Sequence, residues 1–500
     1  MNFVLNDEFE GVRIDSNYSF YQHNNDGELQ GLLKEFAAIN PSQYRVPSGS
    51  TIDGEAVDIT AMMGGEFDNG RGHLMAFAGY QNTNEVLQGD RDYAQCALGT
   101  RNDGSEFTCS GSSTNQFTNI LDLGSNLPTG LWARVDPTTN EFVERNFVSD
   151  TFNYNPYNHF QRPNERYNFG AFGRYDITEN IEAYTELMFM DNRTNSQIAP
   201  SGVFGLGVNG SSGGVNCNNP FLSAQQVQYL CGEIADDTIN RRRNADGELI
   251  DMSGNVLAED DDTFYPDQDN LPDQMALGPD GIAPILNLRR NVEGGPRNND
   301  IRHTTWRGVM GIRGDLEGTS IGYDVSASFA NVHRSEVYNN DLSISRIQKA
   351  LFAVENDAGD IVCSVNADDD PTNDDAACVP YDIFSGNAPD PAAVNYIVSP
   401  LNRDGETTQT IINARLFGSM GDWGIQSPMA MDAPGFALGA EYRRDTLDSN
   451  PDVAFQSGDG AGQGGPTNPI SGAQNVVDVF GELNVPLIQD RPGIETLGFD

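Results

Sequence analysis

The residues with the clearest chemical potential in this chain are its six cysteines. They fall into three local pairs, Cys96 with Cys109, Cys217 with Cys231, and Cys363 with Cys378. Each pair lies in a long connection rich in Asn, Asp, Gly and Ser, where a covalent clip would hold a segment with little core of its own. Six cysteines can pair in many ways, and nearest-neighbour closure is the simplest. Disulfides would imply an oxidising compartment. The alternative is that the cysteines bind a metal. This interpretation is weaker because the sequence has no CxxC motif and only five histidines.

A carboxylate pair is the best candidate for hydrolytic chemistry. Glu182 and Glu186 share the polar parity of one predicted strand. Four residues of extended chain separate them by roughly 13 Å, at ~3.3 Å per residue. That distance exceeds the ~5–9.5 Å between the carboxyl groups of glycoside hydrolases, so we interpret them as solvated carboxylates. Asp315 and Glu317 fall in a short turn, and no HExxH motif or Cys/His nucleophile pair occurs. We therefore predict no enzyme activity and no catalytic residue.

Three further motifs are weak signals for a cofactor or a metal. Residues Gly205–Gly210 read GLGVNG, a formal GxGxxG, but loop-like sequence follows where a dinucleotide site needs a helix. The acidic stretches Glu259–Asp262 and Asp368–Asp375 lack the ligand-and-glycine spacing of an EF-hand loop. We interpret them as solvated loops, with calcium or iron capture as the alternative. No cofactor and no metal site is predicted.

Two clusters are candidates for ligand contact. Arg241–Arg243 is the only basic cluster, and it is either a solvated loop, which we favour, or a contact for an anionic ligand or a lipopolysaccharide phosphate. The second cluster is aromatic: Phe152, Tyr154, Tyr157 and Phe160. These rings either stack on a sugar or anchor the loop to the rim of the sheet, and we favour the anchor. No ligand-binding residue is assigned.

The elements that must position these residues are strands. Side chains of a β-strand alternate between two faces. Tyr167 and Phe169 alternate with Asn168 and Gly170. In the next strand Ile181, Ala183, Leu187 and Phe189 have one parity, and Glu182, Tyr184 and Glu186 have the other. The same pattern predicts about 12 strands, near residues 3–5, 12–22, 56–63, 74–87, 167–177, 181–189, 303–313, 321–329, 411–417, 436–442 and 477–485, with a less certain pair at 131–134 and 141–147 that alternatively belongs to a loop. A short helix is expected over 28–38. Short turns alternate with long loops, as in outer-membrane barrels.

Aromatic residues recur near the predicted strand ends: Tyr18, Tyr80, Tyr167, Tyr175, Tyr184, Tyr323 and Tyr442. Such residues form girdles at the two membrane interfaces of a barrel. The alternative is the ordinary preference of strands for aromatic side chains.

Composition removes two classes of protein. The 500 residues carry 29 Lys and Arg against 73 Asp and Glu, a net charge of −44. Nucleic-acid binding needs a basic surface, so we predict no nucleic-acid partner. No stretch approaches the ~20 continuous apolar residues of a transmembrane helix.

Three segments resemble a known family. The segment FNYNPYNHFQRPNERYNFGAFGRYDITENIEAYTELMFMDNRTNSQIAPSGVF (152–204), NFVLNDEFEGVRIDSNYSFYQH (2–23) and DVFGELNVPLIQDRPGIETL (478–497) are similar to the barrel of TonB-dependent outer-membrane receptors. The likeness covers strands along most of the chain and is weak in the loops. That family has antiparallel transmembrane barrels of about 22 strands with a plugged lumen.

The resemblance implies a location in the outer membrane of a Gram-negative bacterium and active uptake of a scarce nutrient, such as a siderophore–iron complex or an oligosaccharide. Its partners would be membrane lipid, a small-molecule or glycan ligand, and the TonB complex of the inner membrane, acting through a plug. We expect residues 1–500 to be a partial barrel, about 12 of the about 22 strands, with plug, TonB box, signal peptide and C-terminal strands absent. The alternative is a secreted soluble β-rich binding or adhesion protein; a secreted glycan-cleaving enzyme would need a converging carboxylate pair.

Overall fold

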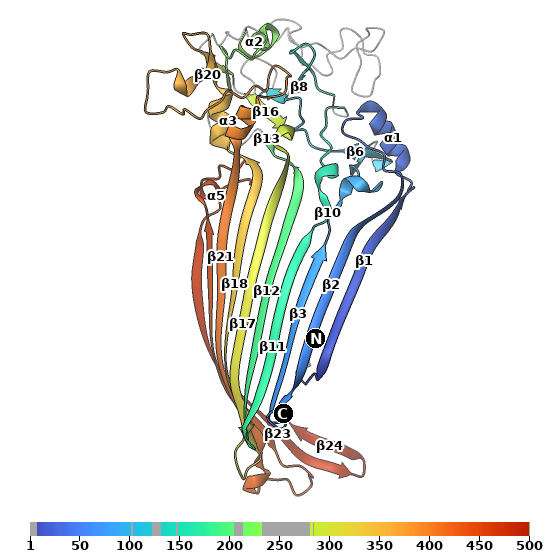
Figure 1. Ribbon diagram of the computed structural model, residues 1–500, viewed down its shortest axis with the longest axis vertical. Helices are drawn as coiled ribbons and strands as arrows, with labels where there is room; N and C mark the ends of the chain where they lie inside the picture. The colour runs from blue at the N-terminus through green and yellow to red at the C-terminus, as the bar shows by residue number, and fades with distance from the viewer. Residues whose placement is uncertain are drawn as a thin grey trace.

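One large antiparallel sheet forms the body of the molecule. The computed structural model describes residues 8–101, 104–122, 132–146, 149–204, 214–232, 281–283 and 285–499. The sheet has 11 strands, which lie side by side along the long axis (Figure 1). In spatial order they are β1 (Gly11–Asn25), β2 (Gly49–Phe67), β3 (Gly72–Thr83), β11 (Asn164–Thr178), β12 (Ile181–Pro200), β17 (Pro296–Asp315), β18 (Ile321–Leu342), β21 (Val398–Ser419), β22 (Gly435–Pro451), β23 (Ile470–Arg491) and β24 (Ile494–Phe499).

The two ends of the sheet differ in their connections, as the sequence predicts. At one end most strands join through short turns, the exception being the connection 420–434 between β21 and β22. Between β2 and β3 the turn holds Asp68 and Asn69 at φ 53° and 57°. Asp and Asn tolerate this left-handed conformation, which the primed hairpin turns require. At the other end the connections are long and gather into a separate layer (Figure 1), here called the cap.

Several strands are longer than predicted. Apolar alternation ends near Phe189 in β12 and Phe329 in β18, but the backbone pairing continues to Pro200 and Leu342. Beyond Phe189 and Phe329 charged and amide side chains lie on both faces of the strand. Hydrophobic periodicity therefore does not predict this part of the strand. The predicted strand at residues 3–5 lies outside the described residues, and the pair at 131–147 belongs to the cap.

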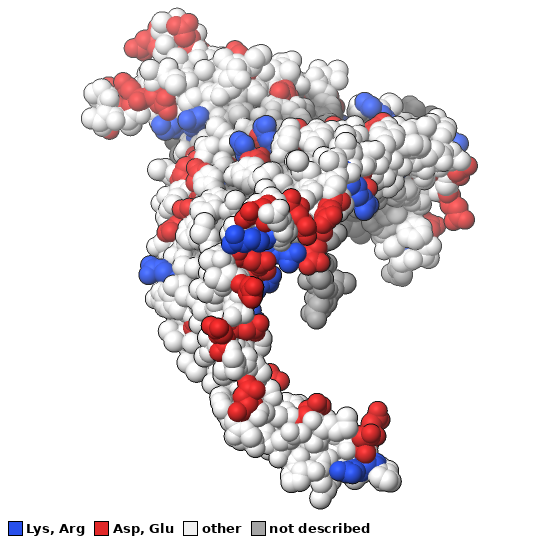
Figure 2. Space-filling view, turned by 60° about the horizontal axis from the view of Figure 1, so that its bottom comes forward, with Lys and Arg blue, Asp and Glu red and all other residues white. Residues whose placement is uncertain are grey.

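The sheet is curved, and among the described residues its edge strands β1 and β24 do not pair with each other. Seen with the turn end brought forward, the molecule is a crescent (Figure 2). Asp and Glu side chains, with Lys and Arg among them, gather along the inner side of this crescent. In the part of the chain that is described, no helix is long and apolar enough to cross a membrane.

The cap is built from several loops that share one core. A five-stranded sheet joins β7 (Asn119–Asp122), β8 (Trp132–Val135) and β9 (Phe142–Glu144) of one connection to β13 (Gly202–Phe204) and β16 (Ile285–Arg290) of the next. Helices α2 (Ala224–Cys231), α3 (Ile344–Leu351) and α4 (Pro391–Ile397) add buried residues to the same core. Three connections thus contribute to one apolar interior, whereas Leu33 and Phe36 pack with Cys96 and Cys109 in a separate cluster.

Smaller elements complete the cap end: α1 (Gln30–Ile39), close to the predicted helix, α5 (Val453–Ser457), β4 (Val86–Leu87), β5 (Ala97–Arg101), β6 (Glu106–Ser110), β10 (His159–Gln161), β14 (Val215–Asn216), β15 (Ile282–Ala283), β19 (Ala353–Glu355) and β20 (Ile361–Cys363).

Candidate functional site

The first candidate region is the polar face of the sheet, the face that carries Glu182 and Glu186. Each carboxylate is held by an arginine of the neighbouring strand β17, Glu186 by Arg307 at 2.8 Å and Glu182 by Arg313 at 2.5 Å. Two carboxylates engaged by separate arginines are not arranged as an acid/base pair. The sequence predicts that Glu182 and Glu186 are solvated carboxylates. In the structure each of them forms an ion pair with an arginine of the neighbouring strand.

A polar hollow lies on this face. It has a volume of about 250 Å³ and is lined by Tyr184, Glu186, Arg313, Asp324 and Arg415, among others. The Tyr184 hydroxyl donates to Asp324 Oδ1 at 2.9 Å, and Arg415 Nη2 donates to Asp324 Oδ2 at 2.7 Å. Tyr184 is therefore not a girdle residue. Its side chain lies on the polar face, on the same side of β12 as Glu182 and Glu186. The hollow is suited to polar side chains or solutes and not to apolar ones.

The opposite face of the sheet is apolar and exposed. Residues that are paired across neighbouring strands have their side chains on the same side of the sheet. One such row on the apolar side consists of Val12, Met63, Ala76, Ala171 and Leu187. Exposure on this face reaches 75% for Val12 and 81% for Val479. Large exposed apolar patches mark sites of interaction with a membrane, another protein or a ligand.

Aromatic pairs bound this apolar face at two levels. Tyr175 stacks on Phe67 near the turn end, and Tyr167 contacts Tyr80 with ring centroids 5.1 Å apart nearer the cap. At the level of Tyr167 and just beyond it the same face becomes charged: Asp191, which faces Tyr167, pairs with Arg302, and Arg193 pairs with Asp300. The apolar face is therefore a band of limited height.

The cysteines are joined in the cap end as the sequence predicts, Cys96 to Cys109, Cys217 to Cys231 and Cys363 to Cys378. The first disulfide packs against the buried face of α1. Within the described residues, no group of three or more His, Cys, Asp and Glu is arranged to hold a metal ion.

The aromatic loop residues divide into two groups. Phe152 is 1% exposed and stacks on Tyr157, and the Arg290 guanidinium lies 4.8 Å from the centroid of the Phe152 ring. Arg290 donates to the carbonyls of Thr114 and Pro200. These contacts tie two connections together, so the anchor interpretation describes Phe152 and Tyr157. Phe160 is 57% exposed and takes no part in this anchor.

Arg290 occupies an unusual environment for a cation. Its side chain is buried, and it lies between the rings of Phe152 and Phe204. Burial, with a smaller contribution from nearby Arg297, lowers the pKa of Arg290 to about 9. The sequence gives no signal for this residue, because its partners come from two distant connections.

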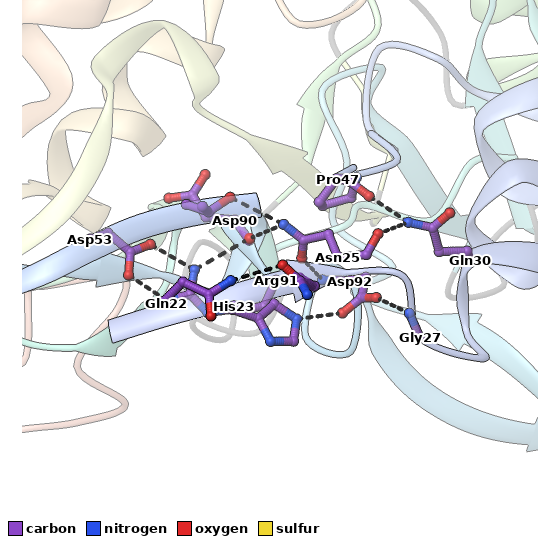
Figure 3. Close-up of polar contacts among 12 residues, drawn as sticks. Gln22, His23, Asn25, Gly27, Gln30, Pro47, Asp53, Asp90, Arg91 and Asp92 are labelled. Atoms are coloured by element: carbon purple, nitrogen blue, oxygen red, sulfur yellow. Dashed lines mark hydrogen bonds and ion pairs between the residues drawn. The ribbon is translucent and has the colours of Figure 1, made fainter. Parts of the chain in front are cut away.

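A network of polar groups joins the cap end of β1 to the first cysteine loop (Figure 3). His23 Nε2 lies 3.0 Å from Asp92 Oδ1, and the Gly27 amide donates to Asp92 Oδ2 at 2.6 Å. The Asp92 amide in turn donates to Asn25 Oδ1. Burial opposes ionisation of Asp92, but the contacts with His23 and Gly27 outweigh it, so the pKa of Asp92 lies below its ordinary value.

A second ion pair supports the same junction. Arg91 donates to both carboxylate oxygens of Asp53, from Nη1 at 2.7 Å and from Nη2 at 2.5 Å (Figure 3). The hydrogen bonds that Arg91 donates to Asp53 raise the pKa of Arg91. Two-point pairing fixes the orientation of the guanidinium. Sequence reasoning missed this network because its members lie tens of residues apart.

Some sequence predictions concern residues without a described structure. Gly205–Gly210, Arg241–Arg243 and Glu259–Asp262 lie outside the described residues. In the acidic stretch Asp368–Asp375, the carboxylates accept local bonds: Asp370 from Thr372, and Asp375 from Lys349 and Tyr396. The Asp370 contact lies within the loop, and the Asp375 contacts tie the loop to α3 and α4.

Comparison with known proteins gives limited information. No family model and no curated protein matches the chain. Two similar solved structures are the ferric yersiniabactin uptake receptor FyuA from Yersinia pestis and the siderophore receptor PiuA from Acinetobacter baumannii. Each is 9% identical with a TM-score of 0.31; the matches cover 91% and 96% of this chain but 42% and 43% of those chains. The chain thus spans less than half the length of either receptor, and at this TM-score its function must be argued from its own residues.

Proposed function

We propose that the chain forms part of the membrane-spanning barrel of an outer-membrane uptake receptor of the TonB-dependent type. The observation that carries the proposal is the two-faced sheet, whose apolar face is exposed and whose polar face carries cross-strand ion pairs. In water, leaving a Leu- or Val-sized side chain exposed forgoes about 1.5–3 kcal/mol of burial. Lipid against the apolar face would recover this free energy along the whole sheet.

The height of the apolar band supports the same proposal. Tyr167 and Tyr175, at its two aromatic levels, are eight residues apart on β11. Eight residues span about 26 Å of strand, or about 20 Å along the membrane normal for a strand tilted by ~40°. Outer-membrane barrels have an apolar band about 25 Å tall between aromatic girdles, and bacterial outer membranes are thin. The charged belt beyond Tyr167 would then lie among the lipid headgroups.

In this proposal the cap faces the cell exterior and the ligand is a scarce nutrient, such as a siderophore–iron complex or an oligosaccharide. Disulfides in the cap suit an oxidising exterior. Energy would come from the inner-membrane TonB complex, as the family resemblance implies. Residues 1–500 would be one part of the receptor barrel.

Membrane fractionation tests the proposal. The natural coding frame that contains this chain is expressed in its host, and inner and outer membranes are separated by density. We expect the protein in the outer-membrane fraction, resistant to extraction with urea and released by detergent. Recovery from the periplasm or medium as a soluble protein would refute the receptor and favour the secreted binding protein.

A further inference from the structure

Three aromatic rings from three separate segments meet at the cap end of the sheet. The rings of His23 and Tyr93 are 5.2 Å apart and nearly perpendicular, and those of Tyr93 and Phe160 are 5.9 Å apart at 74°. Tyr93 is 45% exposed and Phe160 is 57% exposed. Resting on the proposed uptake function, we propose that this aromatic corner binds a neutral pyranose ring of an oligosaccharide.

The aromatic corner lies on the polar side of the sheet. The register between β1 and β2 shifts between Ser19 and Tyr21, and Gly54 of β2 has φ +61°. The extra residue of the bulge therefore belongs to β2, and the alternation of β1 continues without interruption. His23 consequently shares a face with Arg13 and Asp15, toward the inside of the curved sheet.

The corner is also above the membrane band. The pairing of β3 with β11 ends, on the cap side, at Thr83 and Asn164. Thr83 is three residues closer to the cap than the girdle residue Tyr80. Phe160 precedes Asn164 in the chain and lies in β10, which pairs with β4 of the cap end. A solute entering the inner side of the sheet from the cap would pass this position.

The rings are held in place before any ligand arrives. His23 is bonded to Asp92, the residue next to Tyr93, and Asp92 is also held by Gly27 (Figure 3). The disulfide of Cys96 closes the loop a few residues further on. Rigid aromatic side chains contribute contact area at a low cost in conformational entropy, so a fixed corner binds more tightly than three mobile rings.

The local charge selects a neutral ligand. The guanidinium of Arg91, two residues before Tyr93, has a side chain only 4% exposed and is bonded at two points to Asp53. His23 is engaged by Asp92. The chain as a whole carries −44, which disfavours the approach of anions. A pyranose offers an apolar C–H face for an aromatic ring and hydroxyl groups for the polar surroundings, without a charge.

Binding of defined sugars to the detergent-solubilised product of the natural coding frame that contains this chain tests the proposal. Maltohexaose, cellohexaose and xylohexaose are titrated by calorimetry into the wild type, Tyr93→Ala, Phe160→Ala and the double variant. We expect at least one hexasaccharide to bind, and each single substitution to weaken it by about tenfold, as for a buried aromatic contact. Tyr93→Phe, which keeps the ring, should retain most of the affinity.

The matched control is Phe107→Ala. Phe107 is 63% exposed in β6 of the same cysteine loop and lies outside the aromatic corner. This substitution should change affinity by less than about twofold, since exposed side chains away from a binding site contribute little.

Three results would overturn the proposal: no binding of any of the three sugars to folded protein, unchanged affinity in the double variant, or binding only of the anionic ferric complex of 2,3-dihydroxybenzoate. Folding of each variant is checked by its heat-dependent electrophoretic mobility. Since outer-membrane fractionation does not depend on the aromatic corner, a negative sugar result with normal fractionation would refute the ligand assignment alone.

Discussion

A single arginine placed on either side of β12 should distinguish a membrane-facing surface from a water-facing one. Leu187 is 46% exposed on the apolar face and pairs with Ala171. Ala171 lies four residues from each of Tyr167 and Tyr175, the aromatic residues that bound the apolar band, so Leu187 is at the middle of this band. Its neighbour Met188 is 37% exposed on the polar face.

The expected cost of Leu187→Arg is about 2–4 kcal/mol, the value for Arg at the midplane of a lipid-facing barrel strand. That cost lowers the folding equilibrium constant by roughly 30- to 900-fold. Met188→Arg adds a charge opposite Arg307, and like charges facing each other across strands cost only about 0.2–1 kcal/mol.

The assay is urea unfolding of the protein refolded into phospholipid vesicles, followed by tryptophan fluorescence and electrophoretic mobility. We expect Leu187→Arg to lower the urea concentration at the unfolding midpoint strongly, and Met188→Arg to lower it only slightly. Equal effects of the two substitutions, or a larger effect at Met188, would refute the reasoning, because a soluble sheet exposes both side chains to water.

Three further predictions concern the cap end. The pKa of Asp92 lies below its ordinary value of 3.8, so its carboxylate stabilises the junction with Gly27 above that pH and loses this effect as pH falls through the lower folded value. Exchange of the Gly27 amide, corrected for its intrinsic rate, should therefore accelerate as the Asp92 carboxyl group becomes protonated. Protection that stays constant through this protonation would contradict the link. Replacing Cys363 and Cys378 by Ser should destabilise their loop by about 3 kcal/mol and speed its proteolysis while leaving urea unfolding of the sheet unchanged; an unaltered cleavage rate would show that the clip is dispensable. Arg290→Met should remove the hydrogen-bond donor of the Thr114 and Pro200 carbonyls. The free energy of local opening of the cap, measured by hydrogen exchange, should then fall by about 1–3 kcal/mol. Exchange identical to that of the wild type would show that the guanidinium does not hold the connections together.

The strands of the sheet were predictable because their signal is local. Alternation places Phe169 and Leu187 on one face and Glu182 and Glu186 on the other without any knowledge of neighbours. The cysteine pairs were predictable for a similar reason, since each pair is isolated in its own connection. Strand ends were not, because beyond Phe189 both faces of β12 carry polar side chains and the period disappears.

The cap and the aromatic corner were not predictable, because they depend on contacts between distant segments. Nothing near Tyr93 in the sequence indicates that His23 and Phe160 will contact it. The division of the aromatic loop residues had the same cause: Phe152 is buried by Arg290, which lies well over a hundred residues away, whereas Phe160 has no such cover. Loop packing of this kind has no periodic signature to read.

The most direct test of the central claim is the lipid accessibility of successive residues along β12. Single cysteines introduced at positions 183 to 190 are labelled with a nitroxide in vesicle-reconstituted protein; the native cysteines, paired in disulfides, do not react. Relaxation by oxygen, which concentrates in lipid, is compared with relaxation by a water-soluble nickel chelate. The account predicts that odd positions respond to oxygen and even positions to nickel. Nickel accessibility at both parities would contradict a membrane-facing sheet.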